Sequence, residues 1–265
     1  VEDFRFQLHL YLCHHHNLLR HKRVKIQMCK TMFELNHRGL FCTVYFILIP
    51  IYVYLALKYK VMYEGIKTVI FDLGGVIYDV NYHKTINAFK AIGIDRFEEV
   101  YTKAGQSDLF NDLEVGKISR VVFVERIKTL SGQDMTSSQI VNAWNRMLLG
   151  FMPDALACVK RLSGSYRLFL LSNTNEIHIQ EIENRVGAVF FSDFCALFEK
   201  VYLSHELGLR KPHPEVFTHI LEEQGIKANE TLFIDDSIQH VEGAIKAGLH
   251  AHHLIDDQTI DQLFP

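Results

Sequence analysis

The sequence predicts an α/β fold, in which a parallel, doubly wound sheet carries helices on its faces and a small helical bundle inserted between strands. Short apolar runs rich in β-branched and aromatic residues alternate with stretches of helical periodicity, an order typical of parallel sheets. From Ile66 onward the chain has about 200 residues, enough to bury one core and a smaller inserted part. The predicted strands are Thr68–Phe71, Tyr166–Leu171, Lys200–Leu203, Thr231–Ile234 and His250–Ile255.

The first predicted strand, Thr68–Phe71, stops at Asp72, which Gly74 and Gly75 follow closely. A continuous β-branched and aromatic run is typical of a strand buried on both faces. Ligands of open α/β sheets bind at the carboxyl ends of such strands. The run therefore predicts a carboxylate at the ligand-binding edge of the sheet.

Residues 79–154 have a different pattern, with apolar residues at helical spacing and short polar breaks such as Ser131–Asp134. This pattern predicts a helical bundle, a cap, inserted between the first and second strands of a core formed by residues 62–78 and 155–265. Met147, Leu148, Leu149, Phe151 and Met152 are assigned to bundle core and hinge packing rather than to a substrate site.

Two later strands also end in polar groups: Tyr166–Leu171 stops at Ser172–Asn175, and Thr231–Ile234 stops at Asp235 and Asp236. Adjacent carboxylates repel each other unless a cation or a basic group lies between them. Lys211 is such a basic group, and Pro212 after it can open the helix that carries Glu215. Each signal alone is ordinary loop chemistry, but together they predict one site at the sheet edge.

These segments resemble the motifs of the haloacid dehalogenase (HAD) superfamily. The likeness runs from Ile66 to Pro265 and is greatest to small sugar-phosphate phosphatases with a helical C1 cap, such as the bacterial glucose-1-phosphate phosphatases. It implies a Rossmann-like three-layer α/β/α sandwich and a Mg²⁺-dependent phosphatase. The matching segments are Phe71–Val76, Leu171–Asn175, Arg210–Pro212, Phe233–Ser237 and the helix Val241–Gly248.

The predicted metal site consists of Asp72, Asp236 and, directly or through water, Asp235. Mg²⁺ prefers oxygen ligands and keeps several waters, so a few carboxylates suffice. The resemblance adds the backbone carbonyl of Gly74. Asp72 is also the expected nucleophile, which would form an aspartyl-phosphate that water hydrolyses.

The predicted phosphate site consists of Gly75, the hydroxyl of Ser172, the amide of Asn173 and the ammonium of Lys211. A phosphate monoester repels an incoming nucleophile, so these groups would neutralise and orient the phosphoryl group. Lys211 would also balance the charge of Asp72.

Gly74 departs from the pattern of most phosphatases of this superfamily, which carry a second Asp as general acid at that position. Losing a general acid typically costs about 10²- to 10⁴-fold in rate. The enzyme would then prefer good leaving groups, use another group or water, or be weakly active. Asp79 and His83 are candidate substitutes, although exposed polar residues are common at a helix start. The Glu114–Ser119 segment resembles the cap loop that leans over the active site.

Several functions stay open. A Mg²⁺-dependent phosphatase acting on a small phosphate ester, as a monomer or homodimer, leads the candidates. A haloacid dehalogenase of the same fold would have no use for the adjacent acids Asp235 and Asp236, and a phosphosugar mutase would need an acid in place of Gly74. A phosphate-binding module with a decayed site would not need every one of these groups. The sequence does not name the substrate.

Charge and cysteine content narrow the class of protein. The formal net charge is −3, with 9 Lys and Arg against 3 Asp and Glu in residues 1–63, so the remainder is strongly acidic. An acidic domain is a poor candidate for nucleic-acid binding. The five cysteines show no paired metal spacing, which fits a reducing, cytoplasmic setting.

Residues 1–61 lie outside the resemblance. Residues 39–57 carry no charge and are long enough to cross a bilayer, with Lys and Arg on their N-terminal side. The sequence favours an over-extended reading frame with its start at Met62. A membrane anchor and a packed extension are the alternatives.

Overall fold

The computed structural model describes residues 64–95, 97, 108–132, 134–255 and 258–264. The chain divides into two units, Gly65–Asp261 and Val1–Glu64 with Gln262–Pro265, and only elements from the described residues follow below. The last of these elements is helix α15 (Ile260–Leu263). Among the described residues no helix is long and apolar enough to cross a membrane. Residues 1–61, with the predicted apolar stretch 39–57, lie outside this described part.

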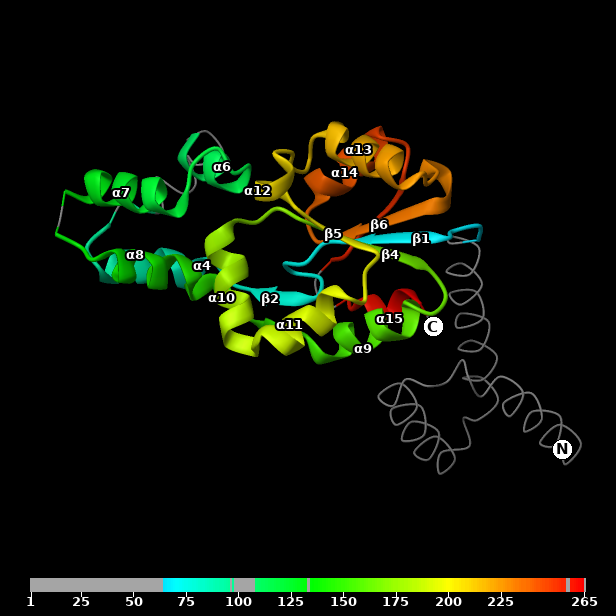
Figure 1. Ribbon diagram of the computed structural model, residues 1–265, viewed down its shortest axis with the longest axis horizontal. Coiled ribbons are helices and arrows are strands. Elements are labelled where there is room, and N and C mark those ends of the chain that lie inside the picture. The colour runs from blue at the N-terminus through cyan, green and yellow to red at the C-terminus, as the bar shows by residue number, and fades with distance from the viewer. Residues whose placement is uncertain (1–63, 96, 98–107, 133, 256–257, 265) are drawn as a thin grey trace, which may run out of the picture. The chain divides into compact units, whose positions relative to one another are not determined.

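A five-stranded sheet forms the centre of the Gly65–Asp261 unit, with the strand order β5-β4-β1-β6-β7 (Figure 1). All neighbouring strands are parallel, which confirms the predicted fold class. β1 and β5 have the predicted bounds, whereas β7 ends at His253 rather than at Ile255. The strands are β1 (Thr68–Phe71), β4 (Arg167–Ser172), β5 (Lys200–Leu203), β6 (Thr231–Asp235) and β7 (His250–His253).

Helices cover both faces of this sheet (Figure 1). On one face lie α13 (Pro214–Gln224) and α14 (Ile238–Lys246), and on the other lie α9 (Pro153–Leu162) and α11 (Ala188–Cys195). Phe217 of α13 packs edge-on against Phe233 of β6, with ring centroids 5.0 Å apart. Burial of such large side chains supplies most of the stabilising free energy.

Helix α13 begins at Pro214, not at Pro212 as the sequence prediction had it. Proline at the first position of a helix gives up no hydrogen bond, because the N–H of that residue has no partner inside the helix. Both prolines meet this condition, so local sequence alone did not decide between them. Pro212 instead lies in the loop that carries Lys211.

The inserted segment 79–154, which we call the cap segment, is mainly helical (Figure 1). Ser119 and Thr136 cap α7 and α8 with their hydroxyls, and Gln139 completes a capping box with Thr136. An aromatic cluster holds these helices together, in which the ring of Trp144 stacks on that of Phe110 at 5.3 Å. The helices are α4 (Tyr82–Ala91), α6 (Asp108–Glu114), α7 (Arg120–Ser131) and α8 (Ser137–Trp144).

The connections between the cap segment and the sheet form a two-stranded antiparallel ribbon of β2 (Tyr78–Val80) and β3 (Leu148–Phe151). The sequence assigned Leu148, Leu149 and Phe151 to bundle core and hinge packing, and the structure places them in this connecting ribbon rather than in a helical core. Leu149 is 38% exposed, and only Met147, in the 3₁₀ turn η2 (Asn145–Met147), and Leu148 are buried. The two segments that connect the cap to the sheet lie side by side, so their backbone N–H and C=O groups can pair with each other. A pattern of helical periodicity in the sequence does not reveal such pairing.

Helix α10 (Glu176–Val186) fastens this ribbon to the rest of the unit. Arg185 donates from Nη1 to the carbonyl of Leu148 at 2.5 Å and from Nη2 to that of Asn145 at 3.2 Å. His178 is buried, with its ring stacked on Trp144 at 4.9 Å. Burial lowers the pKa of His178 to about 4.

The neutral His178 makes folding stability depend on pH. In the unfolded chain His178 has its ordinary pKa of 6.5 and binds a proton below that pH. In the folded chain the same ring stays neutral down to about pH 4. Stability should therefore fall as pH drops through this window, by up to about 3 kcal/mol. Urea unfolding of the wild type and His178→Gln at about pH 7 and about pH 4.5 checks this. Equal losses in both proteins would remove His178 as the cause.

Candidate active site

The carboxyl ends of β1, β4 and β6 meet at one edge of the sheet. β1 lies between the other two, and Phe71 is in register with Leu170 of β4 and Ile234 of β6. Asp72, the next residue, donates its backbone N–H to the carbonyl of Ile234 at 2.9 Å. The parallel register therefore places the carboxylates of Asp72 and Asp235 side by side, as expected from their positions after strands.

Lys211 lies between these two carboxylates. Its side chain is fully buried, with Nζ 2.8 Å from Oδ1 of Asp72 and 2.7 Å from Oδ2 of Asp235. The side chain of Asn173 holds the Lys211 backbone from both sides, accepting from its N–H at 3.0 Å and donating to its carbonyl at 2.9 Å. A buried charge is tolerated only when it is paired, so this arrangement fixes the ammonium at one point.

The two aspartates differ in their electrostatics. Burial raises the pKa of Asp72 to about 8, against the lowering influence of Lys211, and the charge of Asp235 adds to the rise. Burial also opposes ionisation of Asp235, but the charge of Lys211 and the contact with His240 outweigh it and lower its pKa to about 2. Asp235 is therefore the ionised partner of Lys211, whereas ionisation of Asp72 is disfavoured unless further positive charge is supplied at the site.

Asp236 approaches the loop after β1. A Cβ on Gly75 would lie 2.1 Å from Oδ2 of Asp236, and Gly75 has φ +73°. Only glycine fits both conditions. A Cβ on Gly74 would instead meet Val80 at 3.7 Å, an ordinary contact.

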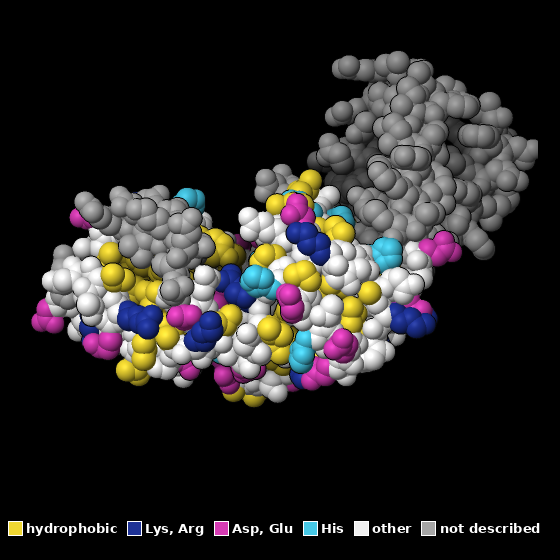
Figure 2. All heavy atoms as spheres, turned by 90° about the horizontal axis from the view of Figure 1, so that it is seen from above, with side chains coloured by type: hydrophobic (Ala, Val, Ile, Leu, Met, Phe, Trp, Pro, Cys, Tyr) yellow, Lys and Arg dark blue, Asp and Glu magenta, His cyan; other side chains and the backbone are white. Residues whose placement is uncertain are grey.

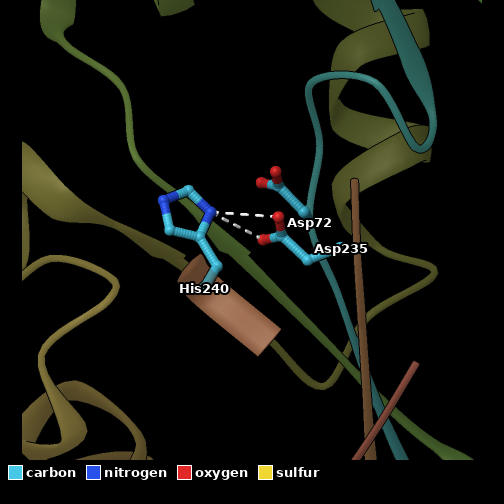
Figure 3. A group of neighbouring side chains, drawn as sticks. All are labelled: Asp72, Asp235 and His240. Carbon is cyan, nitrogen blue, oxygen red and sulfur yellow. Dashed lines mark hydrogen bonds and ion pairs between the residues drawn. The ribbon is translucent and has the colours of Figure 1, made fainter. Parts of the chain in front are cut away.

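A divalent cation fits this edge. The carboxylates of Asp72 and Asp235 converge on one ammonium, and partial desolvation with the charge of Asp235 raises the pKa of the neighbouring Asp236. One ligand atom each from Asp72, Asp235 and His240 lies within 4.8 Å of the others (Figure 3). Carboxylate oxygens are the ligands that Mg²⁺ prefers, so the aspartates of this edge suit a hard cation, whereas the imidazole nitrogen of His240 does not.

The family model for haloacid dehalogenase-like hydrolases matches residues 66–248. The chain belongs to this family. D-ribitol-5-phosphate phosphatase of Bacteroides thetaiotaomicron is 33% identical over 183 residues, which are 66% of this chain and 85% of that relative. The family resemblance expected from the motifs is thereby confirmed.

Solved structures of HAD enzymes share the fold. A HAD family enzyme of Bacteroides thetaiotaomicron in complex with magnesium and inorganic phosphate has a TM-score of 0.66 and 33% identity, covering 76% of this chain and 100% of its own. A HAD-like hydrolase from Porphyromonas gingivalis has a TM-score of 0.66 and 32% identity, covering 75% of this chain and 97% of its own.

The loop after β4 brings Ser172, Asn173 and Thr174 to the HAD site. Ser172 is buried at the strand end. Ser204, which sequence reasoning missed, accepts from the N–H of Thr174 at 2.9 Å and donates to its carbonyl at 3.0 Å. Because Ser204 is 30 residues from Thr174 and follows β5, only the parallel pairing of β4 with β5 could have indicated it.

Two histidines that sequence reasoning also missed hold the turn after β6. Nδ1 of His240, on the first turn of α14, lies 3.0 Å from each oxygen of Asp235, and Figure 3 shows this nitrogen directed at the carboxylate. Nε2 of His253 lies 3.0 Å from the carbonyl oxygen of Asp236. The spacing of His240 from Asp235 was the available signal, since a helix that starts at Ile238 turns its third residue back toward the strand end.

The cap segment reaches the site through Glu114, Gly116 and Arg120. Glu114 pairs with Arg210, the residue before Lys211, at 3.0 Å, and Asn111 accepts from the same guanidinium. A Cβ on Gly116 would lie 2.1 Å from the carbonyl oxygen of His205. Arg120 donates its backbone N–H to Glu176 at 2.6 Å. A cavity of about 500 Å³ beside these contacts is lined in part by Asn111, Lys117, Arg210 and His213.

The proposed substitutes for a general acid, Asp79 and His83, are both exposed. Tyr82, beside His83, is 52% exposed over the whole residue and is a third candidate, which sequence reasoning did not consider. Desolvation and the charges of the site carboxylates, Asp72 foremost, raise the pKa of its phenol. The phenol therefore keeps its proton and can donate a hydrogen bond.

The two glycines after Asp72 should respond differently to the same change. Gly75→Ala forces a Cβ against Asp236 in a strained backbone conformation, so it should lower divalent-cation affinity by at least about tenfold. Gly74→Ala is the matched control and should bind the cation nearly as well as the wild type. Isothermal titration with Mg²⁺ and thermal unfolding measure the two effects. Equal affinities in both variants would contradict the assignment of Asp236 to this contact.

Proposed function

We propose that this HAD hydrolase is a Mg²⁺-dependent phosphatase that hydrolyses a small phosphate monoester through an aspartyl-phosphate on Asp72. The observation that carries the proposal is the buried Lys211 ammonium between Asp72 and Asp235, with Asp236 beside them. The relative named a D-ribitol-5-phosphate phosphatase supports it, as does the HAD enzyme solved with magnesium and phosphate.

Asp72 and Asp236, with the backbone carbonyl of Gly74, would hold the Mg²⁺ ion, and Asp235 would contribute through water. When bound, the ion neutralises phosphoryl oxygens and aligns the ester for in-line attack. The assignment of Asp235 to the outer position follows from its contacts: its oxygens already face Lys211, the N–H of Ser237 at 2.8 Å, and His240.

Asp72 would attack phosphorus with Oδ2. Its Oδ1 already accepts from the N–H of Leu73 at 2.7 Å and lies 2.8 Å from Nζ of Lys211. The new O–P bond forms as the ester O–P bond breaks, and the leaving oxygen takes its proton from water or from another donor, since Gly74 supplies none. Water then attacks the same phosphorus, which releases inorganic phosphate and restores the carboxylate.

Ser172, Gly75 and Lys211 would bind the phosphoryl oxygens during these steps. The side chain of Asn173 is engaged with the Lys211 backbone, so its contribution to phosphate binding would come from its own backbone N–H. Donors fixed in this way stabilise developing charge without having to reorganise.

The substrate would be a sugar or polyol phosphate, the class to which the name of the ribitol-phosphate relative belongs. Its leaving group would face the Glu114–Ser119 loop, which adjoins Arg210 and so lies next to the catalytic lysine. The narrower likeness to glucose-1-phosphate phosphatases stays a prediction.

Asp72→Asn should abolish phosphate release while leaving the fold intact, because an amide cannot form the acyl phosphate. Phosphate release from a panel of sugar, polyol and aryl phosphates, with circular dichroism on the same samples, measures both effects. EDTA should likewise abolish activity in the wild type, and added Mg²⁺ should restore it. Full turnover of a haloacid in EDTA would move the assignment to a dehalogenase.

Gly74 should make the rate depend steeply on the acidity of the leaving group, since that position supplies no proton. Substituted phenyl phosphates give the slope, and primary alkyl phosphates should react more slowly. Gly74→Asp should flatten the slope, because a Cβ has room beside Val80. A shallow slope in the wild type would indicate another acid, and steepening in Tyr82→Phe, but not in Asp79→Asn or His83→Ala, would identify the phenol.

A further inference from the structure

Asp235 is held by several donors at once. It is fully buried and lies 2.7 Å from Nζ of Lys211 through Oδ2, 2.8 Å from the backbone N–H of Ser237 through Oδ1, and 3.0 Å from Nδ1 of His240 through both oxygens. The N–H of Ser237 fixes one oxygen only, so it leaves rotation of the carboxylate plane partly free. The contact of His240 with both oxygens restrains that rotation.

The orientation of Asp235 matters because it sets the position of Lys211. The ammonium has two anionic partners, Asp72 and Asp235, and no exposed surface. If the Asp235 carboxylate turned, Nζ would lose one partner or follow it away from Asp72. Displacement of a catalytic group by about 1 Å can cost about 100-fold in rate.

The chemistry of the contact assigns the proton. An ionised carboxylate only accepts hydrogen bonds, so Nδ1 of His240 must be the donor. In Figure 3 the second ring nitrogen points away from Asp72 and Asp235. His240 is 19% exposed at its side chain, and it belongs to α14 rather than to the strand that carries Asp235. Helix α14 therefore holds the end of β6 in place through His240, which does not contact the reacting groups.

We propose that His240 is a positioning residue: its Nδ1–H orients the Asp235 carboxylate, and through Asp235 it places the Lys211 ammonium against Asp72. The expected effect on turnover rests on the proposed function, whereas the orientation of Asp235 by His240 does not depend on it. His240 does not touch the reacting atoms in this scheme.

Two conservative variants test the contact atom by atom. The side-chain nitrogen of Asn is two bonds from Cβ, as Nδ1 of histidine is, whereas that of Gln is one bond farther. His240→Asn should therefore keep kcat within about threefold of the wild type, and His240→Gln and His240→Ala should lower kcat by about 10- to 100-fold with little change in KM. Gln239→Ala, an exposed neighbour on the same turn, is the control for disturbing the helix start.

Thermal unfolding of the same variants separates positioning from stability. The proposal requires that Asn and Gln variants of equal Tm differ in kcat. If all three His240 variants match the wild type in kcat, or if kcat falls only in step with Tm, His240 merely holds α14 to the sheet and the proposal is wrong.

A measurement without turnover keeps the test independent of the proposed function. ¹⁵N NMR of the histidine rings in the full chain distinguishes the two neutral tautomers, and the proposal requires a proton on Nδ1 of His240. Asp235→Asn should change this signal and Gln239→Ala should not. A proton on Nε2 alone would overturn the proposal. If no phosphate ester is hydrolysed, the proposed function fails while the ring signal still decides the orientation.

Discussion

The structure depends on one buried positive charge. Lys211 has no exposed side-chain surface, and an unpaired ammonium in such a place would cost several kcal/mol. Its two carboxylate partners come from different strands, so the parallel register of β1 and β6 must be maintained for the charge to be tolerated. Asn173 from a third strand end fixes the backbone of the same lysine. The arrangement of the strand ends at this edge of the sheet is therefore determined by the pairing of charges as well as by hydrophobic packing.

The cap segment is tied to this charge from two directions. Where the cap joins the sheet, Arg185 binds the carbonyl of Leu148 in the ribbon and that of Asn145 in the turn before it. At the end of α6, Glu114 pairs with Arg210, and the next residue along the backbone is Lys211. Both side chains of this pair are only 25% exposed, and this burial raises the pKa of Glu114. A change in the position of Glu114 would thus reach Lys211, the proposed catalytic lysine, through one peptide unit.

Local sequence predicted the strands and the acids at their ends because both leave short-range signals: continuous apolar runs and a polar residue where each run stops. It failed where partners are distant in the chain. The β2–β3 ribbon pairs Tyr78 with Phe151, and Ser204 holds Thr174 from the neighbouring strand. The apolar spacing near Leu148 could not show that β2, about 70 residues earlier in the chain, pairs with this segment. The start of α13 was missed because Pro212 and Pro214 satisfy the same local rule.

The adjacent acids Asp235 and Asp236 look equivalent in sequence, but the structure gives them different environments. Asp235 is buried and accepts hydrogen bonds at both oxygens, and its lowered pKa reflects those contacts. Asp236 is exposed, has a raised pKa and faces the glycine loop after Asp72. A carboxylate already satisfied by donors has little left to offer a cation, whereas one with uncompensated charge attracts it. In the proposed mechanism the two acids therefore have different roles: Asp235 compensates the charge of Lys211, and Asp236 would be free to bind the metal ion.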